Sequence, residues 1–412
     1  MSSSPFIADA PITLAPSPTT RAVAEVLVCL PAIASDALPS AFDAIATAFP
    51  GEDILVASAN PAADASEWSS LELIPYTSPV ADIGWVLAVG DYAAAARIAI
   101  DRNTRSVILL GDDNAPINPH LLRILADCIR TKNVDLALPR FALGPNDALV
   151  NSALLYPLSR ALFGADIRFP LAIDAALSTR MAQRLLNNTQ RLVALNQGST
   201  LLWPVAEAAI AGLSVRELPA SDVTPPTPPP TQNQTDFNAL FASVAGSLFA
   251  DVDAKATFWQ RARSLPLRST APPLPDFLAP SAPPPEIYSM IESFHLAQNN
   301  LQEIWSLVLP PQSRLALKKL AQLSPDAFTM EPELWARVVY DFTLAFHLRT
   351  INRNHLLGAM TPLYLAWVAS YLRVVADDPA RAARAIEDTA YAFELEKSYI
   401  VSRWRWPDRF NP

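Results

Sequence analysis

Two groups of acidic residues are the strongest candidates for chemistry in this sequence. Asp112 and Asp113 follow the apolar run "SVILL", which ends at Leu110, with one glycine between. Asp174 lies near the end of "YPLSRALFGADIRFPLAIDAALS", residues 156–178, between apolar neighbours. A buried carboxylate is costly unless a cation or hydrogen-bond donors compensate its charge. Each group therefore allows two interpretations. The acids either bind a divalent cation or a substrate, or they are ordinary acids that form a turn or cap the next helix.

Other familiar kinds of site find little support. The chain has ten glycines and no G-x-G-x-x-G or Walker A pattern, which excludes those two nucleotide-binding motifs. No G-x-S-x-G elbow indicates a hydrolase. Its two cysteines, Cys29 and Cys128, are too few for a disulfide framework or a zinc site, and we expect both to be buried thiols. Of four histidines, His347 is the one that we consider below for a site, although a core position suits it as well.

Composition limits the partners of the chain. The formal net charge is −9 over 412 residues, and no basic stripe suggests binding to nucleic acid. The N-terminal segment lacks the basic region and apolar stretch of a signal peptide. No uninterrupted apolar run reaches the length of a membrane span. We therefore expect a cytoplasmic protein without a membrane span.

The first half of the chain predicts an α/β domain over residues 23–217, after a Pro/Ser/Thr-rich tail at 1–22. Short apolar runs at 24–31, 52–58, 71–75, 85–89, 106–110 and 134–139 are strand candidates. Amphipathic stretches such as 91–103 and 117–133 are helix candidates between them. Near-continuous apolar strands joined by helices are typical of a mostly parallel sheet covered on both faces. Ligands of such a sheet bind at the carboxyl ends of its strands.

The second half predicts a different organisation. Two proline-dense stretches within 218–286 flank one helix and suggest extended connectors. From residue 287 to 412 the pattern is helical throughout. A stripe of large apolar residues at helical spacing indicates a core-facing helix: Trp335, Val338, Val339, Phe342 and Phe346. This all-α region can cover an acceptor site or build a homodimer.

The 156–178 segment resembles bacterial glycosyltransferases of the mannosylglycerate and glucosylglycerate synthase type. A second similar block spans Phe393 to Trp404, and weaker similarity extends over most of residues 24–404. The matching positions in the first block are Tyr156, Pro157, Leu158, Arg160, Ala161, Leu162, Gly164, Arg168, Pro170, Asp174 and Ser178.

The resemblance implies a GT-A-like fold, a nucleotide-diphosphate-sugar donor, a divalent metal (Mg²⁺ or Mn²⁺) and transfer of the sugar to a small glycerate-like acceptor. It places the metal ligand at Asp113, with Asp112 beside it, and a catalytic acid that faces the sugar at Asp174. The family's histidine ligand of the metal is missing from this sequence, and Asp222 is its candidate substitute. The candidate substrate-binding residues are Pro31, Tyr156, Arg168 and His347.

The sequence also departs from this family at several site positions. Gly111 stands where the first metal-binding acid is expected, and Ala172 and Ile173 replace two glycines before Asp174. A nucleotide-contacting acid aligns with Ala57, and a lysine-glycine-rich loop is replaced by "AVGDYAAAA" at 88–96.

Two functions therefore remain open. The chain is either a metal-assisted glycosyltransferase with a partly degraded donor site, or a catalytically inactive scaffold of the same fold that binds a ligand or partner. Convergence of the acids on one open cleft favours the first function, and a cleft filled by Ile173 favours the second.

Overall fold

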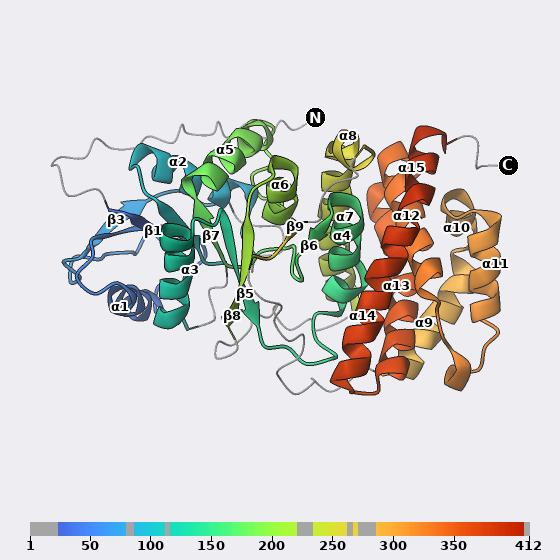
Figure 1. Cartoon of the computed structure of the whole chain (residues 1–412). Coiled ribbons are helices and arrows are strands. Elements are labelled where there is room, and N and C mark those ends of the chain that lie inside the picture. The colour runs from blue at the N-terminus through green and yellow to red at the C-terminus, as the bar shows by residue number, and fades with distance from the viewer. Residues whose placement is uncertain are drawn as a thin grey trace, which may run out of the picture.

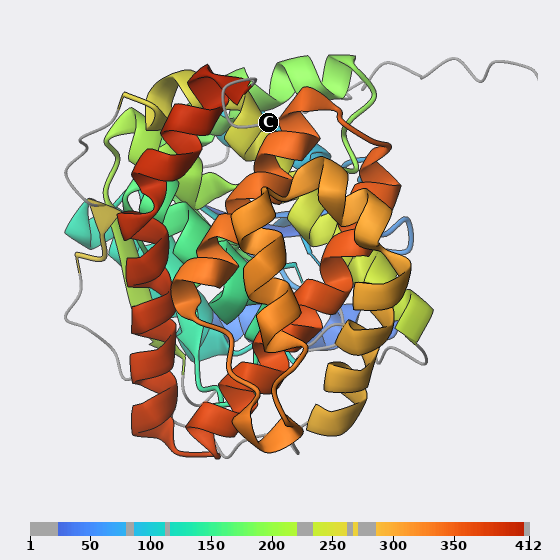
Figure 2. The same ribbon diagram turned by 90° about the vertical axis from the view of Figure 1, so that its right-hand side faces the viewer.

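The computed structural model describes residues 24–79, 86–111, 116–220, 234–261, 267–270 and 286–407. Its two parts lie next to each other: a sheet with its covering helices, and a group of helices formed by the last third of the chain (Figure 1). Helices α4 (Tyr156–Phe163), α7 (Gln234–Ala254) and α8 (Ala256–Trp259) lie between these parts. Figure 2 shows the helical part from its outer side, in front of the sheet.

The sheet has seven strands in the order β3-β2-β1-β4-β7-β5-β8. All neighbouring strands are parallel except at β7, which runs antiparallel to both β4 and β5. The strands are β1 (Val26–Leu30), β2 (Ile54–Ser58), β3 (Leu71–Pro75), β4 (Ser106–Leu109), β5 (Leu136–Phe141), β7 (Ala175–Ser178) and β8 (Val215–Ala220). The mostly parallel sheet predicted from the sequence is confirmed.

The central strand β1 shows why continuous apolar runs form such a sheet. Val26 and Val28 face one core and Leu27 and Cys29 the opposite one, and all four are buried. Helices α1 (Leu38–Ala48) and α3 (Pro119–Lys132) cover the first face. Helices α2 (Val89–Asp101), α5 (Thr179–Ala194) and α6 (Pro204–Ala211) cover the second. Both cysteines are buried free thiols, as expected.

One local prediction from the sequence is wrong, and one open alternative is excluded. The run at 85–89 is not a strand in its described residues, because α2 already begins at Val89 and Ala88 forms only an isolated bridge to Leu201. Asp174 is not a helix N-cap either. It precedes strand β7, and α5 begins at Thr179, five residues later. The cap of α5 is Ser178, whose hydroxyl accepts from the Met181 N–H.

The proline-rich connectors are only partly described. The first starts inside β8, which continues to Ala220, and residues 221–233 lie outside the described residues. The second contributes β9 (Leu267–Arg268), which pairs in parallel with β6 (Ala165–Asp166) in a small separate sheet.

The carboxyl-terminal part is helical from Ile287, as the sequence predicts. It consists of α9 (Ile287–Asn300), α10 (Gln302–Val308), α11 (Pro311–Leu320), the short η2 (Pro325–Ala327), α12 (Pro332–Leu348), α13 (Arg353–Val375), α14 (Pro379–Leu395) and α15 (Lys397–Arg405). The predicted apolar stripe on α12 is buried throughout.

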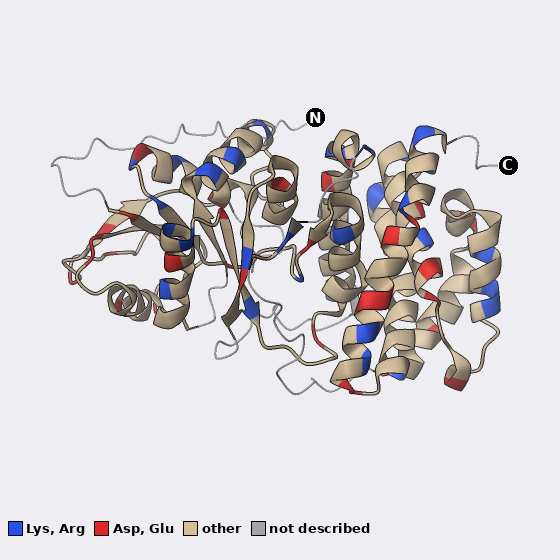
Figure 3. Ribbon diagram, in the orientation of Figure 1, with Lys and Arg blue, Asp and Glu red and all other residues tan. Residues whose placement is uncertain are grey.

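The two parts share one continuous apolar core. Polar contacts connect them as well. The Trp335 indole N–H donates to the Ala153 carbonyl at 2.7 Å, in the π-helical segment η1 (Asn151–Leu155) that precedes α4. The Tyr371 hydroxyl donates to the Pro145 carbonyl at 2.8 Å, in the loop after β5. Charged residues of both signs are distributed over both parts (Figure 3). Among the described residues, no helix is long and apolar enough to cross a membrane.

Candidate functional site

Asp174 lies at the carboxyl edge of the sheet, where ligands of parallel sheets bind. Leu109, the last residue of β4, pairs with Ala175, the first residue of the antiparallel β7. The Asp174 carboxylate accepts a hydrogen bond from the Gly111 backbone N–H at 3.0 Å. Asp174 is half-buried there and also has further contacts. Its charge is thus stabilised in part by a backbone donor of the neighbouring strand end.

Gly111 packs directly against the chain just before Asp174. A Cβ atom at Gly111 would lie 2.5 Å from the carbonyl oxygen of Ile173 and 3.3 Å from its Cγ2 atom. The closest atom belongs to the backbone, so a side-chain rotation cannot relieve the clash. The position where the family resemblance expects a metal-binding acid therefore has no room for a side chain, and Ile173 occupies the space beside it.

The remaining predicted metal ligands cannot be placed. Asp112, Asp113 and Asp222 lie outside the described residues. Among the residues that are described, no group of three or more His, Cys, Asp or Glu side chains could hold a metal ion. With Gly111 unable to carry a carboxylate, the described part of the site does not fit a divalent cation.

The start of α2 lies where the family resemblance has a lysine-glycine-rich loop, and its backbone donors are already used. The Ala88 N–H donates to the Asp91 carboxylate at 3.0 Å. The Val89 and Gly90 N–H groups donate to the carbonyls of Thr200 (2.8 Å) and Gly198 (2.9 Å). Free amides at a helix start are what bind an anion. Here the first-turn amides bond to the chain itself.

Asp91 is a buried acid that the sequence analysis did not single out. The hydroxyl of Ser78 donates to it, and that of Tyr76 lies 3.4 Å away. Burial raises the pKa of Asp91, although these hydrogen bonds oppose the shift. Gly90 is packed just as tightly, because a Cβ there would lie 2.4 Å from the Pro79 ring. The segment around Ser78 and Pro79 therefore closes over the α2 start.

The loops after β1 and β2 are tied to each other. Pro31 directly follows β1 and is half-buried. The Asn60 side chain, after β2, donates to the Ile33 carbonyl at 2.8 Å. Ala57, where the resemblance expects a nucleotide-contacting acid, is fully buried inside β2. The structure therefore supplies no acidic contact for a base at that position.

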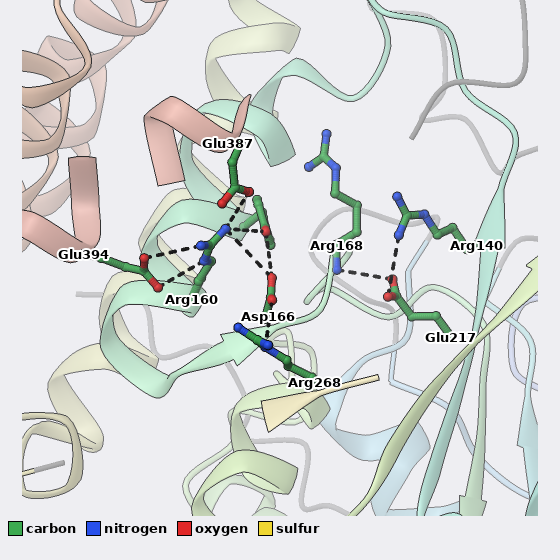
Figure 4. A network of polar contacts seen from close by, with 9 residues as sticks. Arg140, Arg160, Asp166, Arg168, Glu217, Arg268, Glu387 and Glu394 are labelled. Carbon is green, nitrogen blue, oxygen red and sulfur yellow. Dashed lines mark hydrogen bonds and ion pairs between the residues drawn. The ribbon is translucent and has the colours of Figure 1, made fainter. Parts of the chain in front are cut away.

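Tyr156 belongs to a network that joins α4 to α14, and Figure 4 labels its members Arg160, Asp166, Glu387 and Glu394. Its hydroxyl donates to Asp166 at 2.8 Å and accepts from the Arg160 guanidinium at 3.0 Å. Arg160 also pairs with Glu387 at 2.7 Å and with Glu394 at 3.0 Å, both on α14. We call this group the α4–α14 latch: Tyr156, Arg160, Asp166, Glu387 and Glu394. The Tyr156 hydroxyl thus has two partners within the chain.

Arg168 lies next to this latch but has different partners. Its Nη2 donates to the Ser152 hydroxyl at 3.0 Å, and its guanidinium carbon lies 5.2 Å from the centroid of the Tyr156 ring. Its backbone N–H donates to the Glu217 carboxylate at 3.2 Å. Arg140, near the end of β5, pairs with the same carboxylate at 3.7 Å. The sequence analysis missed Arg140 and Glu217, although Arg140 follows a predicted strand directly.

The described contacts of His347 are with α7 and α15, not with residues of the sheet edge. Its Nδ1 is 2.7 Å from Asp253, and its ring stacks on Trp404 with the centroids 4.1 Å apart. His347 is at the end of α12, next to the start of α13. The other end of α13 contacts the loop after β5 through Tyr371. Its 23 residues separate these ends by about 34 Å.

Comparison with known proteins gives structural likeness only. No family model and no curated protein sequence matches the chain. One similar solved structure is glucosyl-3-phosphoglycerate synthase from Mycobacterium tuberculosis in complex with Mn²⁺, UDP-glucose and phosphoglyceric acid, with 15% identity and a TM-score of 0.34 over 55% of this chain and 78% of that chain. Mannosyl-3-phosphoglycerate synthase from Rubrobacter xylanophilus has 14% identity and a TM-score of 0.35 over 58% and 76%. Both are glycosyltransferases by name, but likeness at this level does not establish the activity of this chain.

Proposed function

We propose that this protein is a catalytically inactive, glycosyltransferase-like binding protein, whose ligand lies at the sheet edge beside Asp174. The observation that carries the proposal is the contact between Gly111 and Ile173. It removes the space for one metal-binding acid, and the adjacent Asp174 carboxylate is bonded to the Gly111 N–H at 3.0 Å.

The start of α2 supports the same conclusion. A sugar transferase must neutralise the diphosphate that leaves, and preorganised donors or a metal supply most of that stabilisation. The amides of Ala88, Val89 and Gly90 instead bond to Asp91, Thr200 and Gly198. Opening this segment for a diphosphate requires breaking the hydrogen bonds of three backbone amides, one of which is to the Asp91 side chain. A buried group left without its partner costs about 1–3 kcal/mol.

One observation favours the second candidate, a metal-assisted glycosyltransferase that uses a nucleotide-sugar. The Asp174–Gly111 hydrogen bond brings Asp174 next to the chain position that precedes Asp112 and Asp113. The second candidate requires Asp112, Asp113 and Asp174 to hold the cation together. A cation held by them would need no acid at Gly111.

The deciding experiment measures binding and turnover on the full chain. Purified protein is titrated with UDP-, GDP- and ADP-linked glucose and mannose, with and without Mn²⁺, while the melting temperature and the release of nucleoside diphosphate with glycerate are recorded. Glucosyl-3-phosphoglycerate synthase serves as the positive control with UDP-glucose and phosphoglycerate. We expect no Mn²⁺-dependent stabilisation and no release above the blank. Release that needs Mn²⁺ and disappears in Asp113→Ala would overturn the proposal in favour of the enzyme.

A further inference from the structure

Four exposed arginines lie where α8, α12 and α15 end and α13 begins. They are Arg261, two residues after α8, Arg349, directly after α12, Arg353, the first residue of α13, and Arg405, the last residue of α15. Helix α8 and the end of α15 lie at the same end of the helical part in both views (Figures 1 and 2).

Contacts between α8, α12 and α15 bring these chain segments together. The Arg405 guanidinium donates to the backbone carbonyl of Gln260 at 3.2 Å, which places it next to the segment of Arg261. Trp404, directly before Arg405, stacks on the His347 ring with the centroids 4.1 Å apart. The end of α15 therefore contacts both the segment after α8 and the end of α12.

The start of α13 joins the same surface. The Arg353 guanidinium carbon lies 4.0 Å from the centroid of the Phe346 ring, which belongs to the last turn of α12. Arg349 lies between these two residues in the sequence and directly follows α12. We call the surface formed by the four arginines, together with Leu348 and Trp406, the basic end.

The charges of the basic end have no acidic partners among the described residues. Elsewhere on α12, Arg337 pairs with Glu396 at 2.8 Å. No residue that the structure describes forms such an ion pair with any of the four arginines, and Asp253 in the same region bonds to His347 instead. The chain as a whole has a formal net charge of −9, so the positive field of the basic end is local.

Two large apolar side chains are exposed beside these arginines. Leu348, the last residue of α12, is 44% exposed, and Trp406, directly after α15, is 62% exposed. Tryptophan favours the boundary between water and lipid, because its ring is apolar and its N–H is polar. The charge alone would also suit a nucleic acid. The combination of arginines with exposed Leu and Trp favours the surface of an anionic bilayer.

We propose that the basic end is a peripheral binding surface for an anionic membrane. Its arginines contact the lipid headgroups, while Leu348 and Trp406 enter the boundary between headgroups and acyl chains. The protein then lies on the bilayer through the end of its helical part. The basic end contains none of the residues around Asp174, so this inference goes beyond the proposed function and does not depend on it.

The test measures sedimentation of the full chain with vesicles of equal parts phosphatidylglycerol and phosphatidylcholine, and with vesicles of phosphatidylcholine alone. We expect binding to the anionic vesicles only, and weaker binding as the salt concentration rises. Arg349→Gln/Arg405→Gln should weaken this binding by about tenfold or more. The matched control is Arg105→Gln/Arg381→Gln, which removes the same charge from side chains that are 63% and 57% exposed on other surfaces. It should change the binding by less than about twofold.

Trp406→Ser keeps the test decisive if the double arginine variant does not fold. It should weaken binding several-fold while leaving the salt dependence unchanged, because it removes no charge. No sedimentation with the anionic vesicles would overturn the proposal. Equal losses in the two double variants would overturn it as well, because binding would then follow overall charge. Binding of single-stranded DNA in place of vesicles would assign the basic end to a nucleic acid instead.

Discussion

The two sides of Asp174 along the sheet edge are built from different kinds of contact. On the β1–β4 side, backbone groups bond to the chain itself: the Gly111 N–H to Asp174, and the Val89 and Gly90 N–H groups to carbonyls. On the β5–β8 side, long side chains take part as well. Arg140 pairs with the Glu217 carboxylate at 3.7 Å, and the Arg168 guanidinium donates to Ser152 while its backbone N–H donates to Glu217. One side is held by main-chain donors, and the other also by long side chains.

This difference determines which side can exchange its partners for a ligand. Backbone donors can be freed only when the segment that carries them moves, which disturbs the packing of Gly90 against Pro79 and of Gly111 against Ile173. A guanidinium can turn toward a ligand with small rotations of its own side chain. We therefore expect the β1–β4 side to act as structure and the β5–β8 side to remain available for binding.

Gly111 provides the largest expected effect. Gly111→Ala should lower the free energy of unfolding by about 2 kcal/mol, because the new Cβ meets the Ile173 carbonyl and one side must shift. Gly111→Asp, which installs the acid that the family resemblance expects, should lower it further and should not create Mn²⁺ binding. Urea unfolding followed by circular dichroism measures both variants.

Gly358→Ala is the control for the Gly111 series. Gly358 lies inside α13, and nothing lies within 4 Å of a Cβ built there. This substitution should stabilise the protein by about 0.5–1 kcal/mol, because alanine loses less backbone entropy in a helix. If Gly111→Asp were as stable as the native chain and bound Mn²⁺, the β1–β4 side would have room for a metal-binding acid. The proposed difference between the two sides of Asp174 would then be wrong.

Arg160 separates a structural arginine from the arginines of the basic end. Its side chain is 13% exposed and pairs with Glu387 and Glu394, so Arg160→Met leaves these carboxylates without their cation. We expect a loss of about 1–2 kcal/mol of stability, because the hydrogen bonds of Arg160 are lost while the carboxylates left behind can reach water, with vesicle binding unchanged within about twofold. Glu387→Gln should cost less than about 1 kcal/mol, because Glu387 is 57% exposed. A large loss of vesicle binding in Arg160→Met would place the latch within the binding surface.

Much of the fold could be predicted because its signals are local. The strand runs at 24–31 and 106–110 and the helical pattern from residue 287 depend on neighbouring residues alone, and each corresponds to an element of the structure. The antiparallel β7 could not be predicted in this way. Its four residues look like the start of a helix, and only pairing with β4 and β5 makes them a strand.

The site was harder to predict because it depends on contacts between distant residues. Asp174 was found by its type and by the family resemblance, but its bond to Gly111 spans 63 positions. Tyr156 matched a family motif, and the structure shows its hydroxyl in a latch that reaches α14. Glu217 looks like an ordinary polar strand residue until Arg140 and Arg168 are seen beside it.

The smallest expected effect is a pH dependence of stability. Burial raises the pKa of Glu217, although Arg140 and Arg168 oppose the shift. The folded chain therefore holds this proton to a higher pH than the unfolded chain does, and the stability that comes from it is lost as the pH rises through the raised pKa. Urea unfolding at several values from about pH 5 to about pH 7.5 measures this decline, which should be smaller in Glu217→Gln because the amide does not titrate. Equal declines in the native protein and in Glu217→Gln would mean that Glu217 titrates alike in the folded and the unfolded chain. The two sides of Asp174 would then differ in the kind of contact but not in how well their charges are stabilised.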